Sequence, residues 1–152
     1  MRSTLSHRTL VVANRTAATP LLLEEIERRA VERPTEFVLL IPDVASKAKA
    51  DWTLNEALKS IRRAARGPTG YHEAHVEGIL GGRDAFESIK QTLADSHFDD
   101  VIISTLPARR SKWLRRDLPR RVEQLGVPVT VVTQPAEKRM GLEDIGMAPG
   151  PS

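Results

Sequence analysis

Short apolar runs recur along the chain, separated by segments whose apolar residues have helical spacing. The run from Phe37 to Ile41 is apolar at every position. Because successive side chains of a strand point to opposite faces of its sheet, such a strand has to be covered on both sides. Strands of this kind that alternate with helices form a parallel sheet between helices. The pattern therefore predicts an α/β fold, a three-layer α/β/α sandwich around an open sheet of five parallel strands.

Turn and cap signals locate the individual elements. Thr53 and Glu56 have the spacing of a capping box, and Asp84 is a second candidate N-cap. Pro119 predicts that the last helical segment is broken into a short turn and a helix. We expect strands at residues 9–13, 37–41, 71–76, 101–104 and 129–132, and helices after Thr19-Pro20, at Thr53, at Asp84 and from Lys112 to Leu125.

The expected third strand is polar and carries two of the four histidines. Because a central strand of a parallel sheet is buried on both faces, we place this strand at an edge. His72 and His75 lie three residues apart, so a strand sends them to opposite faces. His7 and His97 fall elsewhere in the chain, and the four histidines are therefore expected at the surface without forming a metal site.

Length and composition indicate one folded domain. The chain has 152 residues, 40% hydrophobic and 28% charged, which is enough for a single core. Residues 1–133 are expected to form the domain, and residues 134–152 a mobile C-terminal tail. No apolar run approaches the roughly 20 residues that span a bilayer, and the polar start does not resemble a secretory signal. Since the chain also has no cysteine, we expect a cytoplasmic protein without disulfides and without membrane contact.

Two segments resemble the universal stress protein family. They are GGRDAFESI before the third helix, and VIIST followed by a loop, a helix and VPVTVV. The resemblance covers residues 9–133 and implies the sheet order 3-2-1-4-5, with the third strand at an edge, as the polar pattern also indicates. It further implies a regulatory or stress-response protein that is not an enzyme and that binds a nucleotide such as ATP or AMP.

In a sheet of this order the chain leaves the first and fourth strands in opposite directions, which opens a crevice at their carboxyl ends where ligands bind. Hydroxyls and cations near these ends are suited to a phosphate group. The resemblance implies that backbone groups near Ile41 hold an adenine edge. The candidate residues for a phosphate or nucleotide ligand are Asn14, Arg15, Thr16, Ile41, Ser104, Thr105, Arg109, Ser111 and Lys112.

The chain departs from the glycine-rich pattern of the nucleotide-binding family members, which is GxxG, nine residues, then Gly followed by Ser or Thr. Ser104 and Pro107 stand at the first two glycine positions, and Arg116, Asp117 and Leu118 at the end of the pattern. Side chains there hold backbone amides away from a phosphate. The sequence therefore leaves open whether the ligand is a nucleotide or another phosphate-bearing molecule.

Basic residues gather between Arg109 and Arg121 in a chain whose net charge is only +3. They are interpreted as part of a phosphate site, or as a solvated helix face whose arginine stems cover apolar surface. A third interpretation is an interaction module that docks an acidic partner or nucleic acid through residues 109–121. Aromatic residues make up 4% of the chain, and Trp113 is expected to pack against the sheet, which argues against nucleic acid.

No catalytic motif is present. The sequence has no GxSxG elbow, HExxH pair or GxxxxGK[ST] loop, and no carboxylate pair among the crevice residues. We therefore expect a protein that is not an enzyme.

The last expected strand is rich in valine. Val129, Val131 and Val132 would form the free edge of the sheet. Because an unpaired apolar edge favours self-association, the sequence predicts a homodimer through this strand, as the family resemblance also implies.

Overall fold

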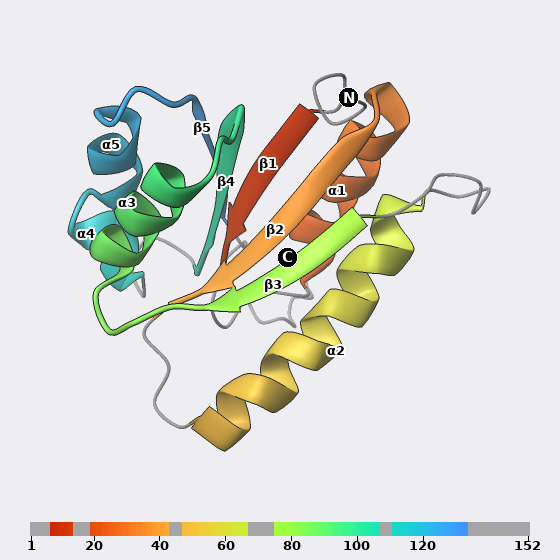
Figure 1. Cartoon of the computed structure of the whole chain (residues 1–152), viewed down its shortest axis with the longest axis horizontal. Helices are drawn as coiled ribbons and strands as arrows, with labels where there is room; N and C mark the ends of the chain where they lie inside the picture. Colours follow the sequence, from red (N-terminus) through yellow and green to blue (C-terminus); the bar gives the residue numbers. More distant parts are fainter. Residues whose placement is uncertain (1–6, 14–18, 43–46, 67–74, 107–110, 134–152) are drawn as a thin grey trace, which may run out of the picture.

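The computed structural model describes residues 7–13, 19–42, 47–66, 75–106 and 111–133, in which strands and helices alternate (Figure 1). The elements are β1 (His7–Val12), α1 (Pro20–Glu32), β2 (Thr35–Ile41), α2 (Lys47–Ala65), β3 (His75–Leu80), α3 (Ala85–Asp95), β4 (Asp100–Thr105), α4 (Lys112–Arg115), α5 (Leu118–Glu123) and β5 (Val129–Thr133). All neighbouring strands are parallel, and their order is β3-β2-β1-β4-β5. The predicted fold class and strand order are confirmed.

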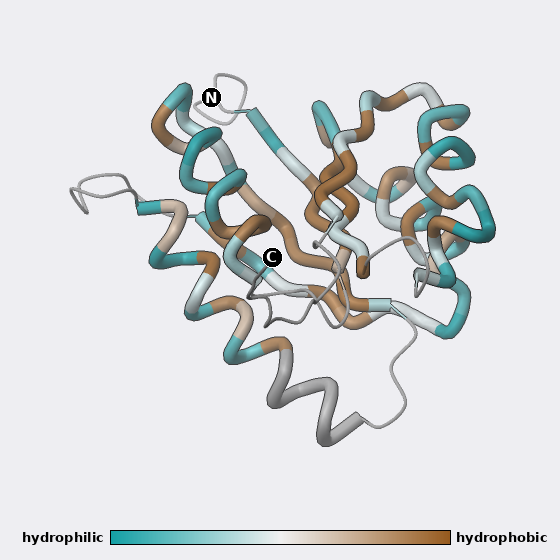
Figure 2. The backbone as a smooth tube through the Cα atoms, turned by 180° about the vertical axis from the view of Figure 1, so that it is seen from behind, coloured by the Kyte–Doolittle hydropathy of each residue, from teal (hydrophilic) through white to brown (hydrophobic). Residues whose placement is uncertain are grey.

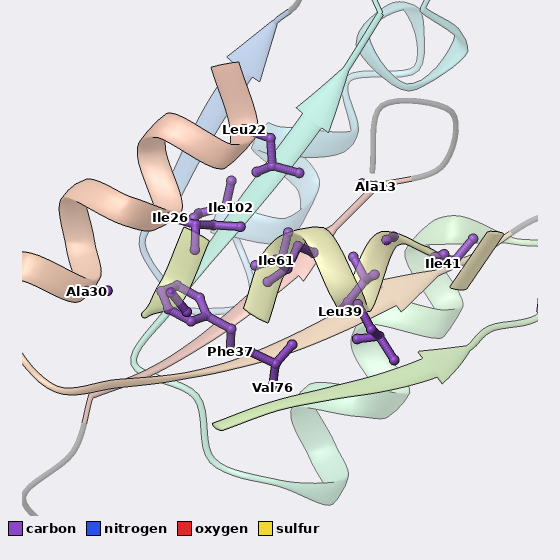
Figure 3. Packing of buried hydrophobic residues seen from close by; sticks show 14 residues of the cluster. Ala13, Leu22, Ile26, Ala30, Phe37, Leu39, Ile41, Ile61, Val76 and Ile102 are labelled. Carbon is purple, nitrogen blue, oxygen red and sulfur yellow. The ribbon is translucent and has the colours of Figure 1, made fainter. Parts of the chain in front are cut away.

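Helices cover both faces of the sheet. One face packs against α1 and α2 in a cluster that contains Leu22, Ile26, Phe37 and Ile61 (Figure 3). The other face packs against α3, α4 and α5, and Trp113 packs against this second cluster, as predicted. In the described ranges no helix has the length and apolar character that crossing a membrane requires.

Burial explains the apolar runs that predict the strands. In β1 and β4 the apolar residues from Leu10 to Val12 and from Val101 to Ile103 have no exposed surface. Figure 2 shows these central strands as the most hydrophobic part of the backbone, with hydrophilic positions on the outer helices. Because both faces of each central strand are covered, an uninterrupted apolar run is what such a strand requires.

The third strand lies at the edge of the sheet, as predicted, but its predicted end was wrong. β3 begins at His75 and continues to Leu80, whereas the prediction ended at Val76; residues 71–74 lie outside the described ranges. Gly78 explains the error, because a glycine inside a strand weakens the strand pattern. Here a Cβ at Gly78 would lie 2.7 Å from Leu54 Cδ1, so the glycine allows α2 to pack closely on β3.

The second helix begins earlier than the sequence predicts. Thr53 was expected to cap this helix, but α2 starts at Lys47 and Thr53 lies in its interior. The capping-box prediction is therefore wrong. Lysine and alanine alternate from position 47 to position 50, and these good helix formers extend the helix through the segment that was expected to be a loop.

The caps of the later helices agree better with the sequence. Asp84 Oδ1 accepts a hydrogen bond of 3.0 Å from the Glu87 N–H and caps α3. The predicted break near Pro119 is present, because Asp117 has a left-handed φ of 59° between α4 and α5. The last helical segment was expected to reach Leu125, but α5 ends at Glu123 and Leu125 is 40% exposed.

Candidate functional site

The carboxyl ends of β1 and β4 lie next to each other. The two strands are paired from Thr9 with Asp100 to Val12 with Ile103. After β1 the chain continues into α1 on one face of the sheet, and after β4 into α4 and α5 on the other face. Because the chain leaves two adjacent strands toward opposite faces, this edge of the sheet is the switch point at which α/β folds bind ligands.

Two predicted site residues belong to one row across this end of the sheet. Val12 pairs with Leu40 of β2 and with Ile103 of β4, so the next row contains Ile41, Ala13 and Ser104. Ser104 is 1% exposed. The Ile41 carbonyl accepts a 2.8 Å hydrogen bond from the Gly81 N–H. The structure therefore brings Ile41 and Ser104 to the same edge, with the small Ala13 side chain between them.

Three further predicted residues follow on the β4 side. The Thr105 and Thr133 hydroxyl oxygens lie 3.2 Å apart and join the ends of β4 and β5. Ser111 is buried, and its Oγ accepts a 3.1 Å hydrogen bond from the Leu114 N–H as the cap of α4. Lys112 follows with an exposed side chain. Thr105 and Ser111 thus have structural contacts, and each hydroxyl still has lone pairs or a proton for a ligand.

Several predicted residues lie outside the described ranges. They are Asn14, Arg15 and Thr16 after β1, Arg109 after β4, and the tail of residues 134–152. The predictions for these residues stay predictions.

The basic residues of α4, of α5 and of the turn between them are exposed, and we call them together the basic face: Lys112, Arg115, Arg116, Arg120 and Arg121. Arg121 lies over the Phe86 ring of α3 at 4.2 Å from the ring centroid, and Arg120 is 3.6 Å from Asp117. The stacked Arg121 fits the interpretation that arginine stems cover apolar surface.

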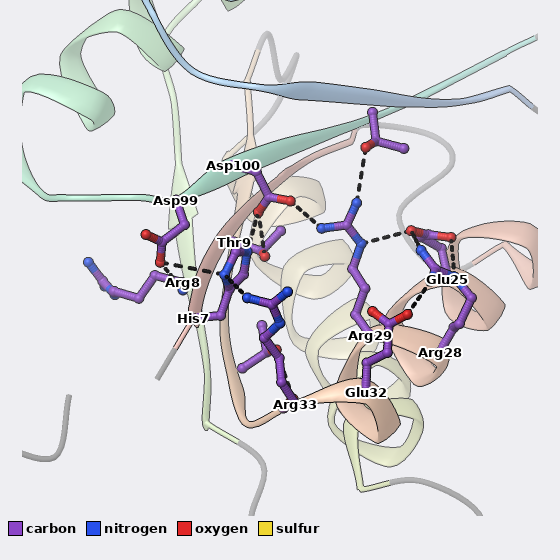
Figure 4. Close-up of polar contacts among 12 residues, drawn as sticks. His7, Arg8, Thr9, Glu25, Arg28, Arg29, Glu32, Arg33, Asp99 and Asp100 are labelled. Atoms are coloured by element: carbon purple, nitrogen blue, oxygen red, sulfur yellow. Dashed lines mark hydrogen bonds and ion pairs between the residues drawn. The ribbon is translucent and has the colours of Figure 1, made fainter. Parts of the chain in front are cut away.

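Charged residues also form a network at the opposite, amino-terminal end of the sheet (Figure 4). Arg29 of α1 donates to Glu25, to Asp100 of β4 and to Thr130 of β5. Asp100 also accepts from Thr9 at 2.7 Å and lies 3.1 Å from His7 Nε2. The network thereby fastens α1, β1, β4 and β5 to one another.

The two histidines of this network converge on adjacent carboxylates, contrary to the expectation that the histidines stay apart. His97 Nε2 lies 3.1 Å from Asp99 Oδ1, and His7 Nδ1 lies 3.8 Å from Asp99 Oδ2. His7 Nδ1 is also 3.2 Å from the Arg33 guanidinium, which only donates. Nδ1 therefore accepts, and Nε2 donates its proton to Asp100.

Two carboxyl groups of the network have lowered pKa values. The Arg8 backbone N–H, 2.8 Å from Asp99 Oδ2, lowers the pKa of Asp99; burial opposes this shift, and the His97 hydrogen bond adds to it. Burial by itself would raise the pKa of Glu25, but the hydrogen bonds and charges of Arg28 and Arg29 outweigh burial. Both groups are therefore held as carboxylates, which suits structural ion pairs.

No local pattern in the sequence indicates this network, because its partners are far apart in the chain. Thr9 and Asp100, for example, are 91 residues apart. Within the described ranges no group of histidine and carboxylate side chains could hold a metal ion.

No protein-family model matches this chain, and no curated protein matches it.

Proposed function

We propose that this chain is a non-catalytic regulatory protein of the universal stress type, which binds a nucleotide or another phosphate-bearing ligand at the carboxyl ends of β1 and β4. The observation that carries the proposal is the pairing of β1 with β4. It makes the edge that contains Ala13 and Ser104 the switch point of the sheet, and α/β folds bind their ligands at such a point.

The side chains at this edge support a phosphate group as the recognised part of the ligand. Ser104, Thr105 and Ser111 supply hydroxyls, and Lys112 supplies an exposed cation beside them. Hydroxyl and ammonium donors are a common combination in phosphate recognition. Arg109 and the residues after β1 extend the proposed site, and the backbone at Ile41 is the proposed contact for a base, as with ATP or AMP.

The proposal is tested by measuring the melting temperature of the full chain with ATP, AMP and inorganic phosphate. A ligand that binds only the folded state increases the free energy of unfolding, by about 2.7 kcal/mol at a concentration 100 times its dissociation constant. The melting temperature rises as a result. We expect the nucleotides to raise it and Lys112→Ala to reduce the effect, because the variant loses a phosphate contact.

Lys90→Ala is the matched control, because Lys90 is also exposed but lies on α3. This variant should respond like the unchanged protein. The proposal is rejected if no phosphate compound changes the melting temperature, or if Lys112→Ala and Lys90→Ala reduce the shift equally.

The basic face supports a second candidate function, an interaction module for an acidic partner. Five cations are exposed on two short helices and the turn between them, and Asp117 is the one acidic residue among the ten from Lys112 to Arg121. Such a surface attracts an acidic protein by long-range electrostatics. Binding that weakens steeply with salt and is lost in an Arg115→Glu, Arg116→Glu variant, without any response to nucleotides, would favour this function.

We also propose that the chain forms a homodimer through β5 and works in the cytoplasm. Val131 is 40% exposed, and Val129 and Val132 are half-buried. Within the described part of the chain β5 pairs with β4 alone, so its other edge has backbone groups available for a second copy.

A further inference from the structure

A groove of about 590 Å³ lies between α3 and the strands β2 and β3, away from the proposed ligand site. Val38 and Leu40 of β2 line it and are 3% and 0% exposed, while Ile79 of β3 is 39% exposed. Figure 1 shows why the groove exists: α2 runs along one side of β3, whereas α3 on the other side lies nearer the middle of the sheet. The outer half of this face therefore has no covering helix among the described residues.

The walls of the groove are acidic. Glu87, Gln91 and Asp95 line it at intervals of four residues, so they form one stripe along about 12 Å of α3. Glu77 of β3 lines the groove as well. Among the residues that the structure describes, neither Glu77 nor Glu87 is paired with a cation, and both are exposed.

The groove is also lined by two cations, one of which is paired with a carboxylate outside it. Arg8 is paired with Glu36 at 3.0 Å and lies over the Phe98 ring at 4.6 Å from its centroid. Arg83 lies in the turn before α3. The groove therefore combines an apolar floor with carboxylates along both walls, in a chain whose net charge is +3.

We propose that this groove is the docking site for a basic amphipathic helix of a partner protein. Both faces of a parallel sheet are normally covered by helices, and in the described part of the chain no helix covers the outer half of this face. A docked helix would place apolar side chains on Ile79 and lysine or arginine side chains against Glu77 and Glu87. Helices that bind grooves do so through apolar residues at positions i, i+3, i+4 and i+7.

The test uses the full chain and a designed probe peptide of roughly 16 residues, with leucines on one helical face and lysines elsewhere. Two control peptides carry glutamate in place of lysine, or the same residues in scrambled order. Affinity is measured by fluorescence anisotropy, and the contact surface by amide NMR shifts. We expect the lysine peptide alone to bind, with shifts at Ile79 and Gln91.

Matched protein variants locate the binding. The double variant Glu77→Lys, Glu87→Lys should bind the lysine peptide with roughly tenfold lower affinity, because two attractive charge pairs become repulsive. Glu24→Lys with Glu123→Lys changes the net charge equally at exposed positions outside the groove, and should leave the affinity within about twofold. Ile79→Ser should weaken binding at high salt as well, since it removes the apolar contact. Circular dichroism checks that each variant is folded.

Several results would overturn the proposal. Equal binding of the scrambled or glutamate peptide would show that helical pattern and charge do not matter. Equal weakening by both double variants would place the contact elsewhere. Binding of spermine as tightly as the peptide would make the groove a site for a small cation. Self-association of the unchanged protein that the Glu77→Lys, Glu87→Lys variant abolishes would make the groove an interface with a second copy of the chain.

Discussion

Arg29 shows how one side chain can hold several elements together. Its guanidinium reaches Glu25 within α1, Asp100 of β4 and Thr130 of β5, and its side chain is only 13% exposed. Burial by itself would lower the pKa of Arg29, but the hydrogen bonds that Arg29 donates to Glu25 and Asp100, and the charges of these carboxylates, outweigh burial and raise the pKa. A cation buried to this degree is tolerated because each of its three guanidinium nitrogens donates to a partner.

The lowered pKa of Glu25 makes the folded state sensitive to acid. A carboxyl group with a lower pKa in the folded state contributes stability that is fully present above its unfolded pKa, about 4.3, and lost as pH falls through the folded pKa. We expect Glu25→Gln to be less stable than the unchanged protein at pH 7 and to lose less stability between pH 7 and pH 3. Urea unfolding at both pH values measures this.

Glu24→Gln provides the control, because Glu24 is the exposed neighbour of Glu25. It should lose stability on acidification like the unchanged protein. If Glu25→Gln loses as much stability between pH 7 and pH 3 as the unchanged protein, the ion pairs of Glu25 do not cause the sensitivity to acid.

Gly78 permits the close packing of α2 on β3. A Cβ at this position would lie 2.7 Å from Leu54 Cδ1 and 3.0 Å from Leu58 Cδ1. Gly78→Val should therefore lower the free energy of unfolding by about 1 to 3 kcal/mol through overpacking. At Gly82 the nearest atom would be 3.9 Å away, so Gly82→Ala should change the stability by less than about 0.5 kcal/mol. Denaturant unfolding compares the two variants, and equal losses would contradict the packing argument.

Among the secondary-structure elements, those that are buried on both faces were the most predictable. β2 and β4 have continuous apolar runs without helical spacing. Their pairing with β1 is part of the sheet order 3-2-1-4-5 that the family resemblance implies. The start of α2 and the extent of β3 were wrong, because Thr53 has a capping pattern inside a helix and Gly78 interrupts a strand pattern. At Thr53 the helix formers that precede it extend the helix, and at Gly78 the close approach of Leu54 explains the glycine.

The candidate site was predictable only in part, because some of its contacts join residues that are far apart in the sequence. The adjacency of β1 and β4 could be predicted, and it brings Ile41 and Ser104 to one edge. The network around Asp100 and the groove beside α3 could not, since each is formed by residues from three or more elements. No spacing in the sequence indicates such a cluster.

The edge strand β5 leads to a prediction about assembly. Val131→Lys should convert a dimer to a monomer, because a charged side chain on an edge strand opposes pairing with another strand. Val31→Lys, at a 56% exposed position of α1, should leave the dimer intact. Sedimentation equilibrium over a range of concentrations measures both. A monomeric unchanged protein, or a Val131→Lys variant that stays dimeric, would contradict the proposed interface.

For the molecule as a whole, the two ends of the sheet have different properties. The amino-terminal end is closed by the ion pair of Arg29 with Asp100 and by the hydrogen bonds that Asp99 and Asp100 accept. The carboxyl-terminal end has hydroxyls at Ser104 and Thr105 and the small residue Ala13 at the switch point of the sheet. In open α/β sheets the carboxyl ends of the strands at a switch point are where ligands usually bind.

The most direct test of the proposed function is an amide NMR titration of the full chain with ATP. A ligand at the carboxyl ends of β1 and β4 should shift the amides of Ala13, Ile41, Ser104 and Thr105 and leave those of Arg8 and Asp99 at the opposite end unchanged. Shifts confined to the amino-terminal end or to the α3 groove, or no shifts at saturating ATP and phosphate, would contradict the proposal.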